Sequence, residues 1–507
     1  MEAIASYHRG LTTVSGVSLD DRTWRDLDLD AVYVVLDRTS SSVGQQCLYH
    51  RLRSSASATT LQAFEALISR MAGNVALREQ CQMALASLRG AAGYDIWRLA
   101  EPGVLEVRRW HVVSPVLALA MLISAALALW WPGAIVITIA LLPVCLAVRI
   151  LNARRVAAVI DALRLIGPLI AAAATLQRAV DDDSSDLTGG LVADVPALRR
   201  LRMVTGWIAR DSVTMDPLSG VLFELLNFFL ALDGNALLFG AIELGRRAAA
   251  LQRTLAAVGE VDAAIAIASY RASTDGWTRP SFHEVGSAVS IRGLRHPLLP
   301  RGVPNAVSFA PPYGVLITGS NMSGKSTFLR SLGVAAVMSR TINTCTATSY
   351  ECPMLAVRSC MGRMDDLIAG RSYYLDEVQG VLSLVHASES SEAHLFLLDE
   401  LFRGTNAVER VAAGEAVLAQ LASANARHLV VAATHDSELV SLLASTYTTF
   451  HFSDRVTAEG LVFEYHLTEG PSTHRNAIAL LELNGAPPEV VARARVLAQR
   501  LERKPES

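Results

Sequence analysis

The chain has 507 residues, a net charge of −3, a hydrophobic share of 51 % and a charged share of only 18 %. These values exclude a disordered or collagen-like chain, and they argue against a protein that holds DNA mainly through overall positive charge. The mean hydropathy of +0.32 is high for a soluble enzyme and directs attention to membrane segments.

Lysine and cysteine usage is also informative. Lys325 and Lys504 are the only lysines in the sequence, so arginine supplies nearly all of the positive charge. The six cysteines form no Cys-x-x-Cys pair and show no Cys/His spacing suited to zinc. We expect buried thiols in a reducing compartment and no metal site built on cysteine. Residues 1–30 carry charges and no apolar core, which argues against a cleavable signal peptide.

Residues 1–108 alternate polar and apolar groups at helical spacing, which predicts the first part of a helical core. Residues 111–148 then contain no Asp, Glu, Lys or Arg. One helix of that length would be about 57 Å long, nearly twice the thickness of a bilayer core. However, the sequence WWPG at 130–133 signals a turn with interfacial aromatic residues. We predict a transmembrane helical hairpin within residues 109–150, with spans over 112–129 and 134–148.

Arginines flank this hairpin on both sides: Arg108 and Arg109 before it, and Arg149, Arg154 and Arg155 after it. By the positive-inside rule, both ends would face the cytoplasm and the tryptophan turn would lie outside. The pattern predicts a protein of the inner or cytoplasmic membrane, held through residues 112–148, with its other domains in the cytoplasm. The alternative is an apolar hairpin within a soluble cytoplasmic protein.

The sequence pattern predicts that residues 151–284 form the second part of the helical core and lever. Helical periodicity covers 153–180, breaks at the acidic stretch 181–186, and resumes to about Arg271. A second apolar run, 218–244, contains acidic and amide side chains that a bilayer would penalise, so we predict buried bundle helices there. These side chains are Glu224, Asp233, Asn235 and Glu243.

From residue 288 onward, short β-branched runs alternate with helices, which predicts an α/β domain over residues 285–507. Residues 314–327 read GVLITGSNMSGKST and match the pattern G-x-x-x-x-G-K-[ST] between an apolar strand and an apolar helix. Glycines let successive N–H groups turn toward phosphates, and the helix N-terminus adds positive potential. This predicts an ATP-binding loop formed by Gly319, Ser320, Asn321, Met322, Ser323, Gly324, Lys325, Ser326 and Thr327.

Two further apolar runs end in candidate catalytic residues. Residues 394–398 lead into Asp399 and Glu400, and residues 428–434 lead into His435. In a P-loop ATPase, Asp399 would hold the Mg²⁺ shell together with Ser326, while Glu400 would orient and activate the attacking water. An imidazole at the tip of a neighbouring strand can contact the γ-phosphate or that water. We therefore predict Lys325, Glu400 and His435 as catalytic residues, Ser326 and Asp399 as Mg²⁺ ligands, and ATP with Mg²⁺ as the cofactors.

These motifs resemble those of the MutS family of ABC-class ATPases. The family's phosphate loop, TGxNMxGKST, is similar to residues 318–327, its LLDExxRGT segment to residues 397–405, and its ATH segment to residues 433–435. Residues 365–373 resemble the family signature DDLxxGxSxF, with Tyr373 in place of the usual threonine after the signature serine. The resemblance covers about residues 288–498, and more weakly residues 19–27, 43–44 and 261–280.

The resemblance implies a homodimer with two composite ATP sites, in which Ser372 reaches the γ-phosphate held by the other subunit. It also implies differences from the family. Because the similarity starts within the first 20 residues, we expect the family's mismatch-reading domain and connector to be missing. The family's lever arms and DNA clamp would have to fit between residues 60 and 260, where the apolar hairpin lies.

Three functions are compatible with these observations. The first is a membrane-anchored, dimeric MutS-like ATPase that converts ATP binding and hydrolysis into movement of helical arms, with double-stranded DNA as an open possibility. The second is a DNA mismatch-repair homologue that binds DNA and has a soluble apolar arm. The third, a transporter-type nucleotide-binding subunit, is less favoured because an LSGGQ-type signature is missing and one hairpin makes a poor transport pathway.

Overall fold

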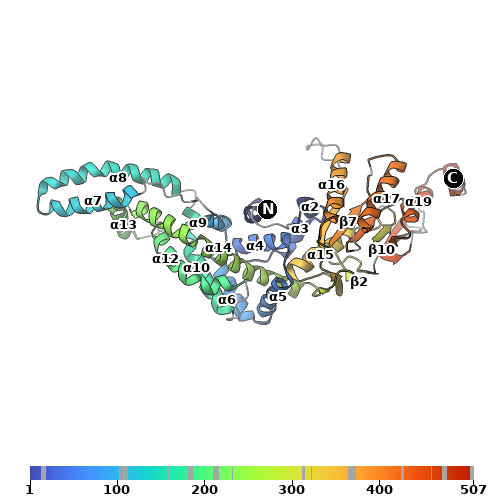
Figure 1. The fold of residues 1–507 in the computed structure, drawn as a ribbon, viewed down its shortest axis with the longest axis horizontal. Helices are drawn as coiled ribbons and strands as arrows, with labels where there is room; N and C mark the ends of the chain where they lie inside the picture. Colours follow the sequence, from blue (N-terminus) through green and yellow to red (C-terminus); the bar gives the residue numbers. More distant parts are fainter. Residues whose placement is uncertain are drawn as a thin grey trace. The chain divides into compact units, whose positions relative to one another are not determined.

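The fold is described from a computed structural model, drawn in Figure 1. It describes all residues except 13–18, 102–103, 105–111, 157–159, 181–186, 209–215, 231, 311–313, 321, 363–372, 403, 424–426, 458–459, 471–476 and 503–507. The chain divides into two compact units. The first comprises Met1–Gly16, Leu36–Arg51 and Ser57–Ser273, and the second comprises Val17–Val35, Leu52–Ala56 and Thr274–Ser507.

The first unit is helical throughout its described secondary structure, as predicted. Its helices are α1 (Glu2–Thr12), α4 (Ser42–Arg53, whose end belongs to the second unit), α5 (Ala58–Gly73), α6 (Val75–Ala86), η1 (Ala91–Tyr94), η2 (Ile96–Ala100), α7 (Val113–Ala128), η4 (Pro132–Ala134), α8 (Ile135–Val156), α9 (Ile160–Arg164), α10 (Ile166–Ala179), α11 (Gly189–Ala193), α12 (Val195–Ile208), α13 (Pro217–Leu230) and α14 (Leu232–Ser273).

The 42-residue helix α14 is the centre of this unit and packs against α5, α10, α11 and α12. Its buried face includes Leu251, Val258 and Ile265. The buried carboxylate of Asp262 accepts hydrogen bonds from the backbone N–H of Ser40 and Ser41 (both 2.9 Å) and from the Ser41 hydroxyl (2.6 Å). These bonds tie α14 to the turn that precedes α4.

The helix predicted over residues 153–180 is divided in the structure. Helix α9 ends at Arg164 and α10 begins at Ile166. Pro168 accounts for the break, because proline lacks an N–H donor and its ring clashes with the carbonyl four residues earlier, which belongs to Arg164. The acidic stretch at 181–186 lies outside the described residues.

Residues 113–156 form a helical hairpin in the structure. Figure 1 shows α7 and α8 side by side, joined by η4. The two helices share a small core of Leu117, Met121, Cys145 and Val148. The hydroxyls of Ser124 and Thr138 lie 2.9 Å apart across the hairpin.

Membrane crossing by this hairpin stays a prediction. Within the described part of the chain, only Ile160–Arg178 is long and apolar enough to cross a bilayer, and 44 % of it is buried inside the structure. The apolar stretches of the hairpin, Val113–Ala128 and Pro132–Val148, are shorter, with 17 residues at most. The flanking residues 105–111 are not described.

The prediction of buried helices over residues 218–244 is wrong for α13. This helix packs against α7 and α8 and buries Gly220 and Asn227. Five of its apolar side chains are nonetheless exposed, and Leu218 is 81 % exposed; the others are Val221, Leu222, Leu225 and Leu226. Contact on one face only explains the difference, because the neighbouring hairpin covers one side of α13 and leaves its other apolar residues outside.

The second unit is α/β, as predicted. A four-stranded sheet has the order β1-β5-β2-β3, and a six-stranded sheet has the order β10-β9-β4-β8-β7-β6. The strands are β1 (Ser281–His283), β2 (Val289–Leu294), β3 (Asn305–Phe309), β4 (Gly314–Thr318), β5 (Ser349–Pro353), β6 (Ala356–Met361), β7 (His394–Asp399), β8 (Leu429–Ala433), β9 (Tyr447–Thr457) and β10 (Gly460–Glu469). The helices are α2 (Asp21–Asp26), α3 (Leu29–Leu36), α15 (Lys325–Ile342), α16 (Tyr373–Ser388), α17 (Ala407–Ser423), α18 (Ser437–Leu442), α19 (Ala477–Leu483) and α20 (Pro488–Glu502).

The middle of the six-stranded sheet positions the candidate site. Strands β4, β8 and β7 are neighbours, run parallel, and are almost fully buried. Unbroken apolar runs of this kind are typical of parallel strands covered on both faces. Because parallel strands end at the same edge, the residues after β4, β7 and β8 come together there. These residues are Gly319, Glu400 and Thr434.

An N-terminal segment also belongs to the second unit, a feature that the predicted domain division does not contain. The carboxylate of Asp26 accepts hydrogen bonds from the Ser359 hydroxyl (2.9 Å) and from the Met361 N–H (3.0 Å). The N–H of Ser359 donates to the Thr23 hydroxyl at 3.0 Å. Helix α2 is therefore fastened to strand β6. The predicted boundaries at residues 108, 150 and 284 stay predictions.

Candidate nucleotide-binding site

The loop between β4 and α15 has the backbone conformation that its glycines permit. Gly319 has φ +143° and Gly324 has φ +113°, which L side chains rarely adopt. A Cβ atom on Gly319 would lie 2.9 Å from the Ser323 hydroxyl and 3.1 Å from the carbonyl of Phe452. Glycine at 319 is thus required by both backbone angle and space. Met322, with φ +69°, adopts a left-handed conformation at the exposed tip of the loop.

Lys325 is the first residue of α15 and is only 4 % exposed. Its ammonium donates hydrogen bonds to the carbonyls of Gly319 (2.7 Å) and Ser320 (2.8 Å). The positive charge is therefore held inside the loop, at the N-terminus of an 18-residue helix whose dipole adds to it. Lysine suits this position, because its ammonium is compact whereas an arginine head group is a wide planar fork.

A pocket of about 790 Å³ opens beside this loop. Ser320, Met322, Gly324, Lys325, Ser326 and Thr327 line it from the loop and α15, and Glu400 lines it from the end of β7. Six of the nine residues predicted to form the ATP-binding loop therefore line this pocket. Gly319 and Ser323 form the loop without lining the pocket, and Asn321 lies outside the described residues.

The opposite wall was not predicted from the sequence. It contains residues from the segment after β2 and from β9 and β10, among them His296, Arg301, Phe452 and Tyr465. Asn305 holds part of this wall in place: its amide donates to the carbonyl of Tyr465 (3.0 Å) and accepts from the N–H of Leu467 (2.8 Å). These bonds span an irregularity in the pairing of β9 and β10. None of the motifs described above includes these residues.

Glu400 and His435 meet at the end of the sheet. Glu400 is buried and its N–H donates to the carbonyl of Ala433 at 2.9 Å, which ties the end of β7 to β8. The Nδ1 atom of His435 lies 3.3 Å from a carboxylate oxygen of Glu400. Asp399 is the last residue of β7. The structure thus brings together Glu400 and His435, two of the residues that the sequence analysis named as catalytic candidates.

The turn after Glu400 is held in an unusual conformation. Glu400 has φ +51° and Phe402 has φ +58°, positive values that are uncommon for residues other than glycine. The N–H of Phe402 donates to the carboxylate of Glu377, a buried residue of α16, at 2.5 Å. Such backbone conformations persist only where surrounding contacts impose them, and they cluster at functional sites.

The residues around the pocket fit a nucleotide with Mg²⁺. Ser326 and Asp399 offer the oxygen ligands that Mg²⁺ prefers. Among the described residues, no group of three or more His, Cys, Asp or Glu side chains could hold a metal ion.

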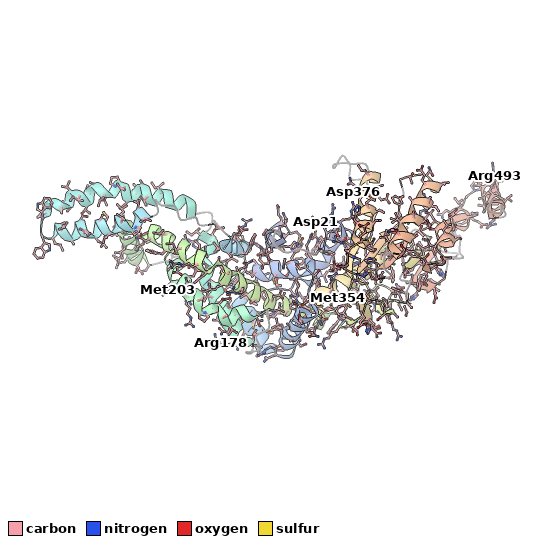
Figure 2. All side chains as sticks on the ribbon, viewed as in Figure 1. Asp21, Arg178, Met203, Met354, Asp376 and Arg493 are labelled. Atoms are coloured by element: carbon pink, nitrogen blue, oxygen red, sulfur yellow. The ribbon has the colours of Figure 1, made fainter. Side chains whose placement is uncertain are left out.

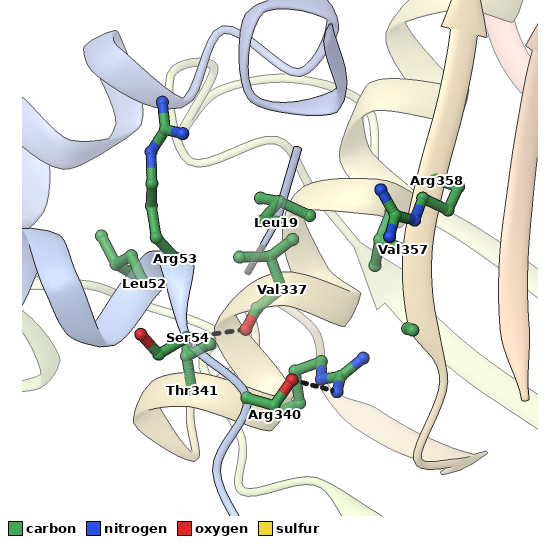
Figure 3. Close-up of a pocket in the computed structure, with 11 residues that line it drawn as sticks. Leu19, Leu52, Arg53, Ser54, Val337, Arg340, Thr341, Val357 and Arg358 are labelled. Atoms are coloured by element: carbon green, nitrogen blue, oxygen red, sulfur yellow. Dashed lines mark hydrogen bonds between the residues drawn. The ribbon is translucent and has the colours of Figure 1, made fainter. Parts of the chain in front are cut away.

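A second, much smaller pocket, of about 30 Å³, lies beside α15 in the same unit (Figure 3). Its wall contains Arg53, Arg340 and Arg358, which form ion pairs with Asp21, Glu392 and Asp20. Its size and its balanced charges make it unsuitable for a nucleotide. The larger pocket is therefore the candidate site.

The signature residue Ser372 lies outside the described residues, so its predicted reach to a second subunit is a prediction still. Helix α16 begins directly after it, at Tyr373.

The sheet order, the glycine loop before α15 and the acidic end of β7 define this unit as a P-loop nucleotide-binding domain. Residues 315–502 match the family description "MutS domain V". The DNA mismatch repair protein MutS of Thermus aquaticus is 36 % identical over 258 residues, which are 50 % of this chain and 31 % of that protein. The protein of the same name from Chlorobaculum tepidum is 30 % identical over 272 residues, 52 % of this chain and 30 % of that protein.

The MutS protein of Thermus thermophilus is 34 % identical over 256 residues, 50 % of this chain and 30 % of that protein. These matches support a protein of the MutS family, as the motifs predicted. The matched region covers about half of this chain and less than a third of the relatives' length.

Proposed function

We propose that this protein is a MutS-type ATPase that binds ATP with Mg²⁺ and hydrolyses it. The observation that carries this proposal is the convergence of Lys325 and Glu400 on one pocket, with His435 3.3 Å from Glu400. A cation for the phosphates and a base for the water are the two groups that phosphoryl transfer to water needs most.

Each residue has a distinct role in this reaction. Lys325 offsets the negative charge of the β- and γ-phosphates, and the backbone N–H groups at the start of α15 face the same anion. Mg²⁺, held by Ser326 and Asp399, would neutralise charge on the phosphate oxygens. Glu400 accepts a proton from water as the water oxygen bonds to the γ-phosphorus and the bond to ADP breaks. His435 lies where it can contact the γ-phosphate or the water.

The proposal extends to a homodimer in which Ser372 of each chain completes the other chain's site. Binding of ATP would then favour closure of the two ATPase units, and closure would change the helical unit in the manner of a nucleotide-driven switch. Support for this part comes from family membership and from the position of α16 directly after the signature segment.

Attachment to a membrane through residues 112–148 is also proposed. The stretch has no charged residue, and many apolar side chains of α7 and α8 point away from the shared core, including Leu119, Leu122 and Ile139. Trp130, at the turn, is 90 % exposed. Figure 2 shows side chains extending outward from both helices of the hairpin. Exposed apolar area of this extent marks an interaction surface, and a lipid bilayer is the partner that suits a wholly uncharged one.

DNA binding is the second candidate function, and the comparisons favour it over membrane attachment. The relatives are named as DNA mismatch repair proteins, and their similarity to this chain centres on the ATPase unit. A duplex that raises the ATPase rate, with an effect that falls steeply as salt increases, would support this function. A rate that is the same with and without duplex across the salt series would contradict it.

The ATPase proposal is tested with the two lysines of the chain. Lys325→Ala is expected to weaken ATP binding by at least about tenfold, because it removes the cation nearest to the phosphates. Lys504→Ala is the matched control and should bind ATP like the wild type. Binding is measured by titration with a fluorescent ATP analogue, and turnover by phosphate release. Equal affinities for wild type and Lys325→Ala would contradict the assigned site.

A further inference from the structure

Arg410, in the first turn of α17, makes a two-pronged ion pair with Asp436. Its Nε lies 2.9 Å from one carboxylate oxygen and its Nη2 lies 2.7 Å from the other. The side chains are 19 % and 10 % exposed, so the pair is largely shielded from water. A bidentate pair of this kind fixes orientation as well as distance, because the planar guanidinium matches the carboxylate.

Asp436 occupies the N-cap position of α18 but does not cap that helix. It is the residue that precedes α18, where an aspartate ordinarily accepts a hydrogen bond from a first-turn N–H. Its side chain makes no such capping bond. Both oxygens are instead directed to Arg410, so the carboxylate connects the loop after β8 to α17 rather than stabilising its own helix.

This loop carries His435, and it is fixed on both sides of that residue. Before it, the N–H of Thr434 donates to the carbonyl of Ile317 in β4 at 3.0 Å. After it, the N–H of Asp436 donates to the Thr434 hydroxyl at 3.0 Å. In addition, the ion pair between Arg410 and Asp436 connects this loop to α17.

The imidazole of His435 lies between two carboxylates. Its Nδ1 is 3.3 Å from Glu400 and its Nε2 is 3.9 Å from Asp436. Glu400 and Glu438 also contribute to the negative surroundings of the Arg410 guanidinium. Because Arg410 engages both oxygens of Asp436, that carboxylate is kept from turning to His435 and competing with Glu400 for the ring.

We propose that Arg410 is a positioning residue for ATP hydrolysis, which holds Asp436 and thereby keeps His435 beside Glu400. This inference rests on the ATPase function proposed above. Arg410 does not line the pocket, so its loss should disturb the geometry of the reaction and leave nucleotide binding nearly unchanged. Small misplacements of catalytic groups reduce rates strongly, since the reacting atoms need close alignment.

The test compares steady-state hydrolysis in four variants of the full chain. Arg410→Ala is expected to lower kcat about tenfold with KM within about twofold of the wild type. Arg410→Lys keeps the charge but loses the fork, and should retain an intermediate kcat. The double variant Arg410→Ala with Asp436→Ala should be faster than Arg410→Ala alone, because it removes the carboxylate that would compete for His435.

The matched control is Arg340→Ala. Arg340 forms an ion pair with Glu392 in the same unit, near the end of α15 and about 22 Å along that helix from Lys325. Its kcat should equal that of the wild type. Because Arg340 is also largely buried, this control shows what the loss of an arginine pair alone does to the unit.

Four results would overturn the inference. Arg410→Ala could match the wild-type kcat, its KM could rise as much as its kcat falls, Arg340→Ala could lose as much activity, or the double variant could be no faster than Arg410→Ala. Absence of ATP hydrolysis by the wild-type chain would instead contradict the proposed function itself and, with it, this inference. The two failures are thus distinguishable by the wild-type rate.

Discussion

Single residues with left-handed backbone angles lie around the candidate site. Gly319 and Gly324 permit the phosphate loop, and Glu400 and Phe402 adopt positive φ angles where the chain leaves β7. For residues other than glycine, such angles cost on the order of 1–3 kcal/mol each. These backbone conformations persist because buried contacts hold them. One such contact is the hydrogen bond from the Phe402 N–H to the carboxylate of Glu377.

Gly319→Ala should reduce ATP affinity by at least about tenfold, because both the backbone angle and the space near Ser323 and Phe452 oppose a Cβ atom. Gly286→Ala is the matched control. Gly286 also has a positive φ, +103°, but no atom lies within 4 Å of its added Cβ. Both variants should lose some thermal stability, and only Gly319→Ala should lose ATP binding in a titration. Equal affinities in the two variants would contradict this account of the loop.

At the scale of elements, strands β4, β7 and β8 could be predicted because each is a short, buried, unbroken apolar run followed by polar site residues. The pairings that build the rest of the site are long-range. Asn305 contacts Tyr465 across 160 positions of sequence, and Asp26 reaches Ser359 across 333. No local sequence pattern indicates which distant strand forms a pocket wall, so Phe452 and Tyr465 could not be predicted as pocket residues.

Helix α13 was predicted incorrectly for a related reason. Its polar residues argue against an ordinary transmembrane span, but they do not reveal which face of a helix has a neighbour. In the structure α7 and α8 contact it and, more weakly, α14. The composition of α13 predicts a helix, whereas the burial of its side chains depends on which neighbouring helices pack against it.

The contact between α14 and the turn before α4 depends on Asp262. Asp262→Ala should lower the free energy of unfolding by about 2–4 kcal/mol, because three donors from Ser40 and Ser41 lose a charged acceptor in a buried place. Asp161→Ala is the control, since Asp161 is exposed and should change stability by less than about 0.5 kcal/mol. Urea unfolding of the full chain measures both. Equal effects would contradict the assigned role.

The same carboxyl group predicts a pH dependence. Burial is the largest cause that raises the pKa of Asp262 from its ordinary 3.8 to about 6, against the hydrogen bonds from Ser40 and Ser41 that lower it. The folded state therefore binds this proton more tightly than the unfolded state. The stabilisation that comes from this tighter proton binding is fully present below about pH 4. As the pH rises through 6, it is lost, and the free energy of unfolding falls by about 3 kcal/mol. The difference in unfolding free energy between wild type and Asp262→Asn should change over this range, and a constant difference would contradict the prediction.

At the scale of the whole molecule, the protein combines a unit that matches MutS domain V with an apolar hairpin in the helical unit. The family match covers residues 315–502, and the hairpin lies outside it. The function of the helical unit therefore has to be established from its own surface.

Leu122→Glu combined with Ile139→Glu should release the protein from membranes, because a charge near the centre of a bilayer costs about 2.5–3.5 kcal/mol per residue. Both side chains are more than half exposed on the hairpin. Val34→Glu, at an exposed apolar residue of the other unit, is the control and should fractionate like the wild type. Cell fractionation without detergent is the measurement. Recovery of the wild-type protein in the soluble fraction would contradict membrane attachment and favour the DNA-binding alternative.

The central claim is that the pocket beside Lys325 is an ATPase centre with Glu400 as its base. The most direct measurement is the single-turnover hydrolysis of ATP with Mg²⁺ by wild type and by Glu400→Gln, together with ATP affinity. The variant is expected to bind ATP like the wild type and to hydrolyse it about 10²–10⁴-fold more slowly. Wild-type turnover in Glu400→Gln, or no hydrolysis by the wild-type protein, would contradict it.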